Sequence, residues 1–112
     1  MNPNRVTMLS AATAAAYSQR ITPGQSKSPR TFQAEGSTTA GAGAAQLKLW
    51  GSNLQSPSVA STADWALLAT IDLTLATTKA GGGAVIDSSW THLMVELVSI
   101  SGTGASVNAY LG

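Results

Sequence analysis

The 112-residue chain contains no cysteine and few charged residues. The lack of cysteine excludes disulfide bonds, thiolate nucleophiles and cysteine-ligated metals, and it leaves the redox compartment open. Charged residues make up 10% of the chain, against a usual share of about 25%. Because a surface with so little charge repels identical copies only weakly, the composition favours self-association.

The chain is also short of groups that act as acids, bases or ligands. Its one histidine, His92, stands four residues before Glu96, about 13 Å away along an extended strand, so the two cannot form a catalytic dyad directly. Asp64, Asp72 and Asp87 do not have the spacing of a calcium loop, and no Gly-x-Ser-x-Gly or phosphate-binding glycine motif occurs. We expect Asp64 and Asp87 to form turns, and His92 to lie at the surface or in an interface. The sequence predicts no catalytic residue, no cofactor-binding residue and no metal ligand, and hence a protein that is not an enzyme.

Long apolar runs are missing as well. No run approaches the ~20 residues of a membrane-spanning helix, and Ser10, Thr13 and Ser18 interrupt the apolar block that follows the first residues. We therefore expect no secretory signal and no membrane partner. Basic residues are not interleaved with aromatic ones, which argues against nucleic-acid binding. The default is a protein made in the cytoplasm.

The pattern that is present is strict two-residue alternation. Between residues 65 and 75, apolar side chains occupy every second position: Trp65, Leu67, Ala69, Ile71, Leu73 and Leu75. Successive side chains of a strand point to opposite faces, so this period predicts a long strand with one buried face.

Residues 90–100 predict a second strand, with one set of side chains inward (Leu93, Val95 and Leu97) and another outward (His92, Met94 and Glu96). Ile100 is out of phase, which predicts a bulge near Val98 and Ser99. The Gly102-Thr103-Gly104 turn then predicts a hairpin in which residues 105–111 return antiparallel. In that hairpin Val107 and Ala109 share the inward face.

Shorter segments complete a pattern typical of an all-β sandwich. Two segments alternate in phase, one with Phe32 and Ala34 inward and one with Ala45, Leu47 and Leu49 inward. The three glycines at 81–83 predict a flexible turn, after which Val85 and Ile86 re-enter the core. We therefore expect a single small antiparallel β-sandwich, jelly-roll-like, with its core in residues 31–112 and an extended N-terminal arm in residues 1–30. Within the arm, residues 10–20 fit either a helix or an edge strand, and we favour the strand.

The charge is unevenly divided between these two parts. Residues 1–30 hold four basic and no acidic residues, whereas residues 31–112 hold two basic and five acidic ones. This asymmetry is typical of an arm that docks on an acidic surface, although scattered cations also suit an arm that is merely soluble. The candidate partner-binding residues of the arm are Arg5, Val6, Met8, Leu9, Tyr17, Arg20, Lys27 and Arg30.

The three tryptophans are the other candidates for recognition. Trp65 has the phase of the core residues, Trp90 begins a strand at the rim, and Trp50 is opposite in phase to Leu47 and Leu49. Trp50 and Trp90 are therefore the candidate interface aromatics. A sugar-binding platform would need two of them on one open surface, which the alternation does not favour.

Four stretches of the chain, from residue 10 onward, resemble small neutral β-sandwich proteins encoded by tailed bacteriophages: SAATAAA, TFQAEGSTTAGAGAAQLKLWGSN, LATIDLTLATT and SSWTHLMVELVSISGTGASVNAYLG. The resemblance implies a virion component at the capsid surface, a decoration or cement protein that binds and stabilises the shell. Its implied partners are the major capsid protein and copies of itself in a homo-oligomer. A tail or head–tail joining protein remains an alternative within the same resemblance. From a different class, a carbohydrate-binding module also remains open.

Overall fold

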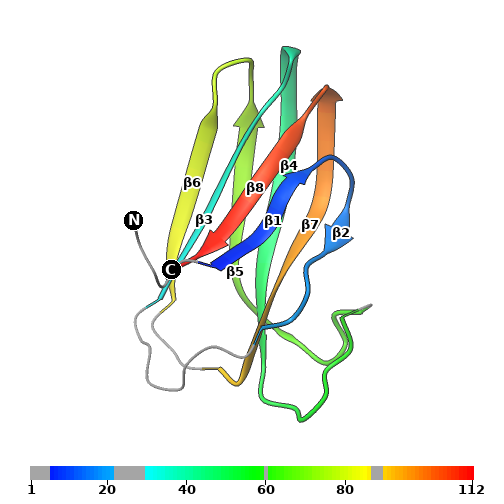
Figure 1. The fold of residues 1–112 in the computed structure, drawn as a ribbon, viewed down its shortest axis with the longest axis vertical. Helices are drawn as coiled ribbons and strands as arrows, with labels where there is room; N and C mark the ends of the chain where they lie inside the picture. Colours follow the sequence, from blue (N-terminus) through cyan, green and yellow to red (C-terminus); the bar gives the residue numbers. More distant parts are fainter. Residues whose placement is uncertain (1–5, 22–29, 60, 87–89) are drawn as a thin grey trace.

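The computed structural model describes residues 6–21, 30–59, 61–86 and 90–112. These residues form eight β-strands and no helix, arranged as two antiparallel sheets packed face to face (Figure 1). The strands are β1 (Val6–Ala12), β2 (Ala16–Tyr17), β3 (Arg30–Ser37), β4 (Ala40–Ser52), β5 (Ala66–Leu75), β6 (Ala80–Ile86), β7 (His92–Thr103) and β8 (Ser106–Leu111). The described segments thus contain no helix of the length and hydrophobicity needed to cross a bilayer.

The strand order is that of a jelly roll. One sheet has the order β1-β8-β3-β6 and is called here the β3 sheet; the other, the β4 sheet, has the order β2-β7-β4-β5. Among the described strands, only β4 and β5 follow each other within one sheet, and every other connection crosses between the layers. Eight strands wound in this way form the double-sheet jelly roll. The predicted antiparallel sandwich, including its jelly-roll character, is confirmed.

The core lies between the two sheets and follows the predicted alternation in most strands. Phe32 and Ala34 of β3 are fully buried, as are Leu47 and Leu49 of β4. The far end of β5 behaves in the same way, with Ile71, Leu73 and Leu75 turned inward. Burial of these side chains contributes about 1.5–3 kcal/mol each for the larger ones, so alternation is the main determinant of the layers.

Two of the three register shifts within the β4 sheet are bulges of one residue, and only one of these two was predicted. Gln46 pairs with Ser99 while Leu47 pairs with Leu97, so Val98 is the extra residue of the expected bulge and Ile100 turns back towards the core. A second bulge occurs in β5, where Leu49 pairs with Ala69 but Trp50 pairs with Leu67. The extra residue, Leu68, packs against the core. Leu67, expected inward, is therefore 49% exposed.

The predicted hairpin of β7 and β8 is wrong. The two strands belong to different sheets, and the turn between them, with Gly102 and Gly104 at positive φ, carries the chain from one layer to the other. Val107 and Ala109 are buried as expected, but they line the core from the β3 sheet, whereas Leu93 and Val95 line it from the β4 sheet. Alternation predicts which side chains point inward, but it does not predict which of the two sheets contains their strand.

The triple glycine is a strand segment and not the predicted flexible turn. Gly81, Gly82 and Gly83 pair in unbroken register with Glu35, Ala34 and Gln33 of β3. Gly82 faces inward, where a Cβ atom would lie 2.9 Å from Cγ2 of Ile71, so the close approach of the two sheets requires a glycine there. Ile86 enters the core, whereas Val85, also expected there, is 66% exposed.

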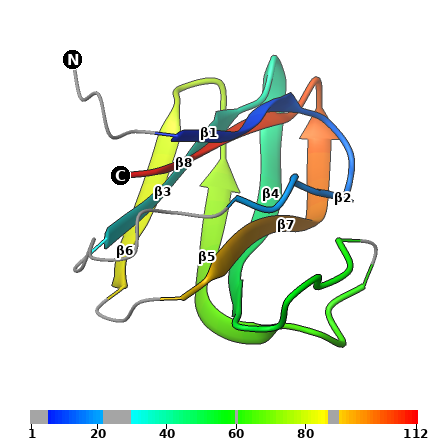
Figure 2. The same cartoon turned by 60° about the horizontal axis from the view of Figure 1, so that its bottom comes forward.

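The described part of the N-terminal segment is built into the sandwich. β1 pairs with β8 at the edge of the β3 sheet, and β2 pairs with β7 at the edge of the β4 sheet. Residues 10–12 and 16–17 are therefore strands, as favoured from the sequence. Figure 2 shows the consequence, with β6 at one border of the molecule and β2 at the other.

Candidate functional site: the outer face of the β4 sheet

The outer face of the β4 sheet brings together side chains from all four of its strands. Leu67 of β5 stands opposite Trp50 of β4, while Lys48 of β4 and Tyr17 of β2 stand on either side of Glu96 of β7. Side chains in directly opposed positions have Cβ atoms about 4.5–5.5 Å apart. We call these five residues, Tyr17, Lys48, Trp50, Leu67 and Glu96, the outer patch.

The indole of Trp50 is the centre of the outer patch and is fixed by polar contacts. Its Nε1 donates a hydrogen bond of 3.0 Å to Oε1 of Glu96. Nζ of Lys48 lies 5.9 Å from the centroid of the ring, within the range of a cation–π interaction. Because the ring is held in one orientation, it would lose little conformational entropy on binding a partner.

Two exposed apolar side chains flank the fixed indole. Leu67, directly opposite Trp50, is 49% exposed, and Tyr17, opposite the Glu96 that accepts from the indole, is 38% exposed. An apolar and aromatic group of this kind, bordered by charged side chains, has the composition of a protein contact site. The bulge at Leu68 creates half of this arrangement, because it turns Leu67 outwards.

The loop between β4 and β5 adds further apolar groups next to this sheet. Leu54 and Val59 are 52% and 39% exposed. Several hydrogen bonds hold the loop: for example, Trp65 Nε1 donates to the Ser58 carbonyl (2.6 Å), the Ser58 amide donates to Asp64 (3.1 Å), and Arg20 Nη1 donates to the Pro57 carbonyl (3.1 Å). Asp64 is therefore the turn-forming residue that the sequence predicted, and Arg20 is bound to the chain's own loop.

Two side chains near the outer patch, Met94 and His92, are more buried than expected. Met94 and His92 have the outward phase of β7, but they are 0% and 8% exposed. The prediction of a surface position for His92 is wrong. Trp65 is buried as predicted, yet it lies apart from the core cluster between the sheets.

The structure does not gather the predicted arm residues on one surface. Leu9 is part of the core, Val6 and Met8 are half-buried in β1, and Arg30 is buried with Nη1 3.5 Å from the Gly112 carbonyl oxygen. Arg5, Lys27 and the predicted turn residue Asp87 lie outside the described residues. Tyr17 is the arm residue that reaches the outer patch.

The two candidate interface tryptophans lie in different environments. Trp50 is in the outer patch, whereas Trp90 packs against the core over Gly51, where a Cβ atom would lie 2.8 Å from the indole ring. Trp90 instead shares a hollow of about 350 Å³ with Trp65 at the end of the sandwich. Trp50 and Trp90 thus form no common platform.

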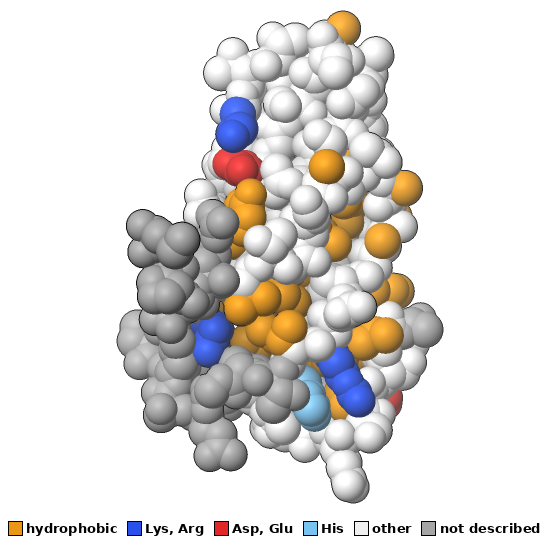
Figure 3. Space-filling model, in the orientation of Figure 1, with side chains coloured by type: hydrophobic (Ala, Val, Ile, Leu, Met, Phe, Trp, Pro, Cys, Tyr) orange, Lys and Arg blue, Asp and Glu red, His pale blue; other side chains and the backbone are white. Residues whose placement is uncertain are grey.

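The opposite face, formed by the β3 sheet, has a different character. Its main polar feature is Glu35, which accepts a hydrogen bond of 3.2 Å from the Tyr110 hydroxyl and lies 3.6 Å from Nζ of Lys79. Figure 3 shows few charged side chains on this face and a group of hydrophobic ones near its middle. The outer patch is the stronger candidate, because it holds an indole between a carboxylate and an ammonium group beside exposed apolar side chains.

Sequence reasoning identified Trp50 and Tyr17 but missed Lys48, Leu67 and Glu96. Lys48 and Trp50 share a phase in β4, and Glu96 is in the outward set of β7, so alternation placed each on an outer face. Their meeting depends on the β4–β7 register, which no local pattern reveals. The outward position of Leu67 could not be predicted, because nothing in the sequence indicates the bulge at Leu68.

No group of three or more metal-ligating side chains occurs among the residues that the structure describes. Comparisons with models of known protein families, with curated proteins and with solved structures find no match to this chain.

Proposed function

We propose that this protein is a non-enzymatic structural component of a bacteriophage virion that decorates and stabilises the capsid, docking on the major capsid protein through the outer patch. The observation that carries the proposal is the fixed indole of Trp50 beside the exposed side chain of Leu67. The phage context rests on the resemblance of the four quoted stretches. The jelly roll adds support by analogy, since this architecture occurs in viral capsid proteins.

The energetics of such docking suit the outer patch. Burying Leu67 and Tyr17 on a partner would contribute roughly 1.5–3 kcal/mol each before the cost of association. Tryptophan is among the residues that most often dominate a protein interface. Repetition around a shell then adds avidity, so that modest single contacts are sufficient.

The proposal is tested with capsids that lack the protein, by co-sedimentation with increasing amounts of the purified chain. Trp50→Ala is expected to weaken binding at least tenfold, since truncation of a central interface tryptophan typically costs 2 kcal/mol or more. Thr74→Ala, a change at an exposed position near the far end of β5, is the matched control and is expected to bind like the wild type. Wild-type protein that stays in the supernatant, or equal binding by Trp50→Ala, would contradict the proposal.

Copy number per particle distinguishes the capsid surface from the tail as the site of binding. Coverage of the whole shell supports decoration, and a single ring per particle supports the tail or head–tail alternative.

Deletion of residues 1–20 is a poorer test of the arm. It would remove β1 and β2, together with the core residue Leu9, and so would change folding as well as binding. Tyr17→Ala leaves both strands in place and examines the one described arm residue that lies in the outer patch.

A carbohydrate-binding module is the second candidate, favoured by the hollow that Trp65 and Trp90 line. Aromatic rings beside a hollow can stack on sugars. Against this, Asn53 Oδ1 accepts from the Thr91 amide and Asp64 accepts from the Ser58 amide, so the nearby polar side chains hold the loops. Glycan binding that is lost in Trp90→Ala but kept in Trp50→Ala would favour this candidate over capsid docking.

A further inference from the structure

The free side of β6 presents backbone groups that the described chain does not use. The Gly112 amide donates to the Thr31 carbonyl (2.9 Å), so the backbone groups of Thr31 point towards β8 and those of the next residue, Phe32, point towards β6. Phe32 is opposite Ala84, so the backbone N–H and C=O groups of Ala84 point towards β3. By the same alternation, Gly81, Gly83 and Val85 direct their N–H and C=O groups away from the sheet, where no backbone partner occurs within the described residues.

The other three sheet edges carry features that discourage pairing with a further strand. β1 has two register shifts and a positive φ at Ala11, β2 has two residues, and β5 carries the bulge at Leu68. Bulges and short lengths of this kind are the usual protection of natural edges. β6 is different: its seven residues pair with β3 without a shift, and they include no charged residue and no proline.

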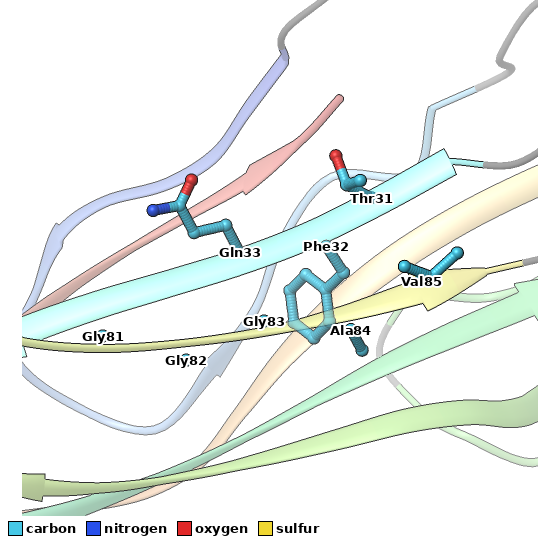
Figure 4. Close-up of a pocket in the computed structure, with 8 residues that line it drawn as sticks. All are labelled: Thr31, Phe32, Gln33, Gly81, Gly82, Gly83, Ala84 and Val85. Carbon is cyan, nitrogen blue, oxygen red and sulfur yellow. The ribbon is translucent and has the colours of Figure 1, made fainter.

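The outer surface beside this edge is hollowed and has one exposed apolar side chain. Figure 4 shows Thr31 and Gln33 of β3 pointing outwards; Gly83, which is opposite Gln33, has no side chain, and neither has Gly81, two residues further along β6. The resulting groove has a volume of about 630 Å³. Val85 lies at its end and is 66% exposed.

We propose that β6 pairs with β6 of a second copy of this chain, antiparallel about a twofold axis, with Gly83 opposite Gly83 and Val85 opposite Gly81. In this register the free groups of residues 81, 83 and 85 meet one another and form about six hydrogen bonds, two for each pair. The β3 sheets of the two copies then become one continuous sheet across the dimer.

A second copy of the chain suits the free edge of β6, because this edge is complementary to itself. A twofold interface brings the same surface together from both sides, and here it places the exposed Val85 side chain of each copy next to the empty position of Gly81 in the other. Uncharged strands also meet without the repulsion that like charges produce across a pair. The proposal does not depend on capsid docking, because β6 belongs to the β3 sheet and the outer patch to the β4 sheet.

The test is the mass of the full chain in solution, measured by light scattering and sedimentation over a range of micromolar concentrations. The wild type is expected to dimerise, and Gly81→Lys to be monomeric under the same conditions. A Cβ at Gly81 would have its nearest neighbour at 3.6 Å, so the lysine fits the fold while adding charge to the edge. Thr7→Lys, an exposed change at the opposite edge of the same sheet, is the control and is expected to remain dimeric. A monomeric wild type, or a Gly81→Lys dimer as stable as the wild type, would overturn the proposal.

Cross-linking tests the register independently. Opposed residues of a hydrogen-bonded pair have Cα atoms about 5.5 Å apart, which lies within the range of a disulfide bond. Since the chain has no cysteine, Gly83→Cys is expected to give a covalent dimer on mild oxidation, and Thr7→Cys is not. Equal cross-linking of both variants, or of neither, would refute the pairing. Failure of these experiments leaves the capsid-binding result of Trp50→Ala unaffected, so the two proposals fail separately.

Discussion

At the scale of single residues, the neighbouring glycines Gly82 and Gly81 of β6 lie in different surroundings. Gly82 faces Ile71 across the core, and Gly81 faces solvent. The same chemical change at the two positions therefore separates the effect of packing from the effect of backbone entropy. The pair also shows why a run of three glycines was misleading as a turn signal, since close approach of the sheets, not flexibility, requires the central one.

We predict that Gly82→Ala destabilises the fold by about 1–3 kcal/mol, because its Cβ would lie 2.9 Å from Ile71 Cγ2 and overpack the core. Gly81→Ala is expected to leave stability unchanged or to raise it by up to about 1 kcal/mol, because alanine restricts the unfolded chain and its Cβ makes only an ordinary contact, 3.6 Å from the Ala34 carbonyl oxygen, in the folded one. Urea unfolding followed by tryptophan fluorescence measures both changes. Equal effects at the two positions would show that the sheets are not in close contact at Gly82.

At the scale of strands, the sequence predicts the inward set of side chains better than their partners. Phe32, Leu47 and Leu97 are all fully buried where the alternation placed them, because burial of apolar side chains is a property of each strand alone. Strand pairing depends on segments far apart in the chain, and the Gly102–Gly104 turn serves a crossing between sheets as well as it serves a hairpin. The register that brings Glu96 to Trp50 is likewise a long-range property.

Bulges also limit what a local sequence pattern can predict about the positions of side chains. The one at Val98 was visible because Ile100 fell out of phase with Leu97, whereas Leu67 and Leu68 are the same residue type and conceal the shift between them. Leucine at both positions suits either phase, so only the structure identifies Leu67 as part of the outer patch.

The bulge at Val98 leads to a prediction about deletion of a residue. Without Val98, Leu97 and Ile100 both point inwards in a regular strand, with Ser99 between them. We expect the deletion variant to fold cooperatively, with a loss of about 0.5–3 kcal/mol, the usual range of a single change. Deletion of Asp72, which is exposed but lies in a regular part of β5, is the control. It would turn one flank of β5 inside out, and we expect no folded protein. Circular dichroism and thermal unfolding measure both variants, and equal behaviour would argue that Val98 is not a bulge.

At the scale of the whole molecule, the jelly-roll connections determine how the chain must fold. Among the described strands, β4 and β5 are the one pair that is both consecutive and hydrogen-bonded. All other sheet pairs join strands that are separated in sequence, for example β1 with β8. Closing such long loops is entropically costly, and domains of this type fold in milliseconds to seconds.

This topology predicts an order of events. The β4–β5 hairpin is the pairing with the smallest loop to close, so we expect it to form by the transition state, and β8 to dock afterwards between β1 and β3. Leu73→Ala in β5 should then mainly slow folding, and Val107→Ala in β8 should mainly speed unfolding, since both residues are buried and both changes lower stability. Stopped-flow fluorescence of the tryptophans measures the two rates. A larger effect of Val107→Ala than of Leu73→Ala on the folding rate would place nucleation in the β3 sheet, and the last step would then be docking of the hairpin.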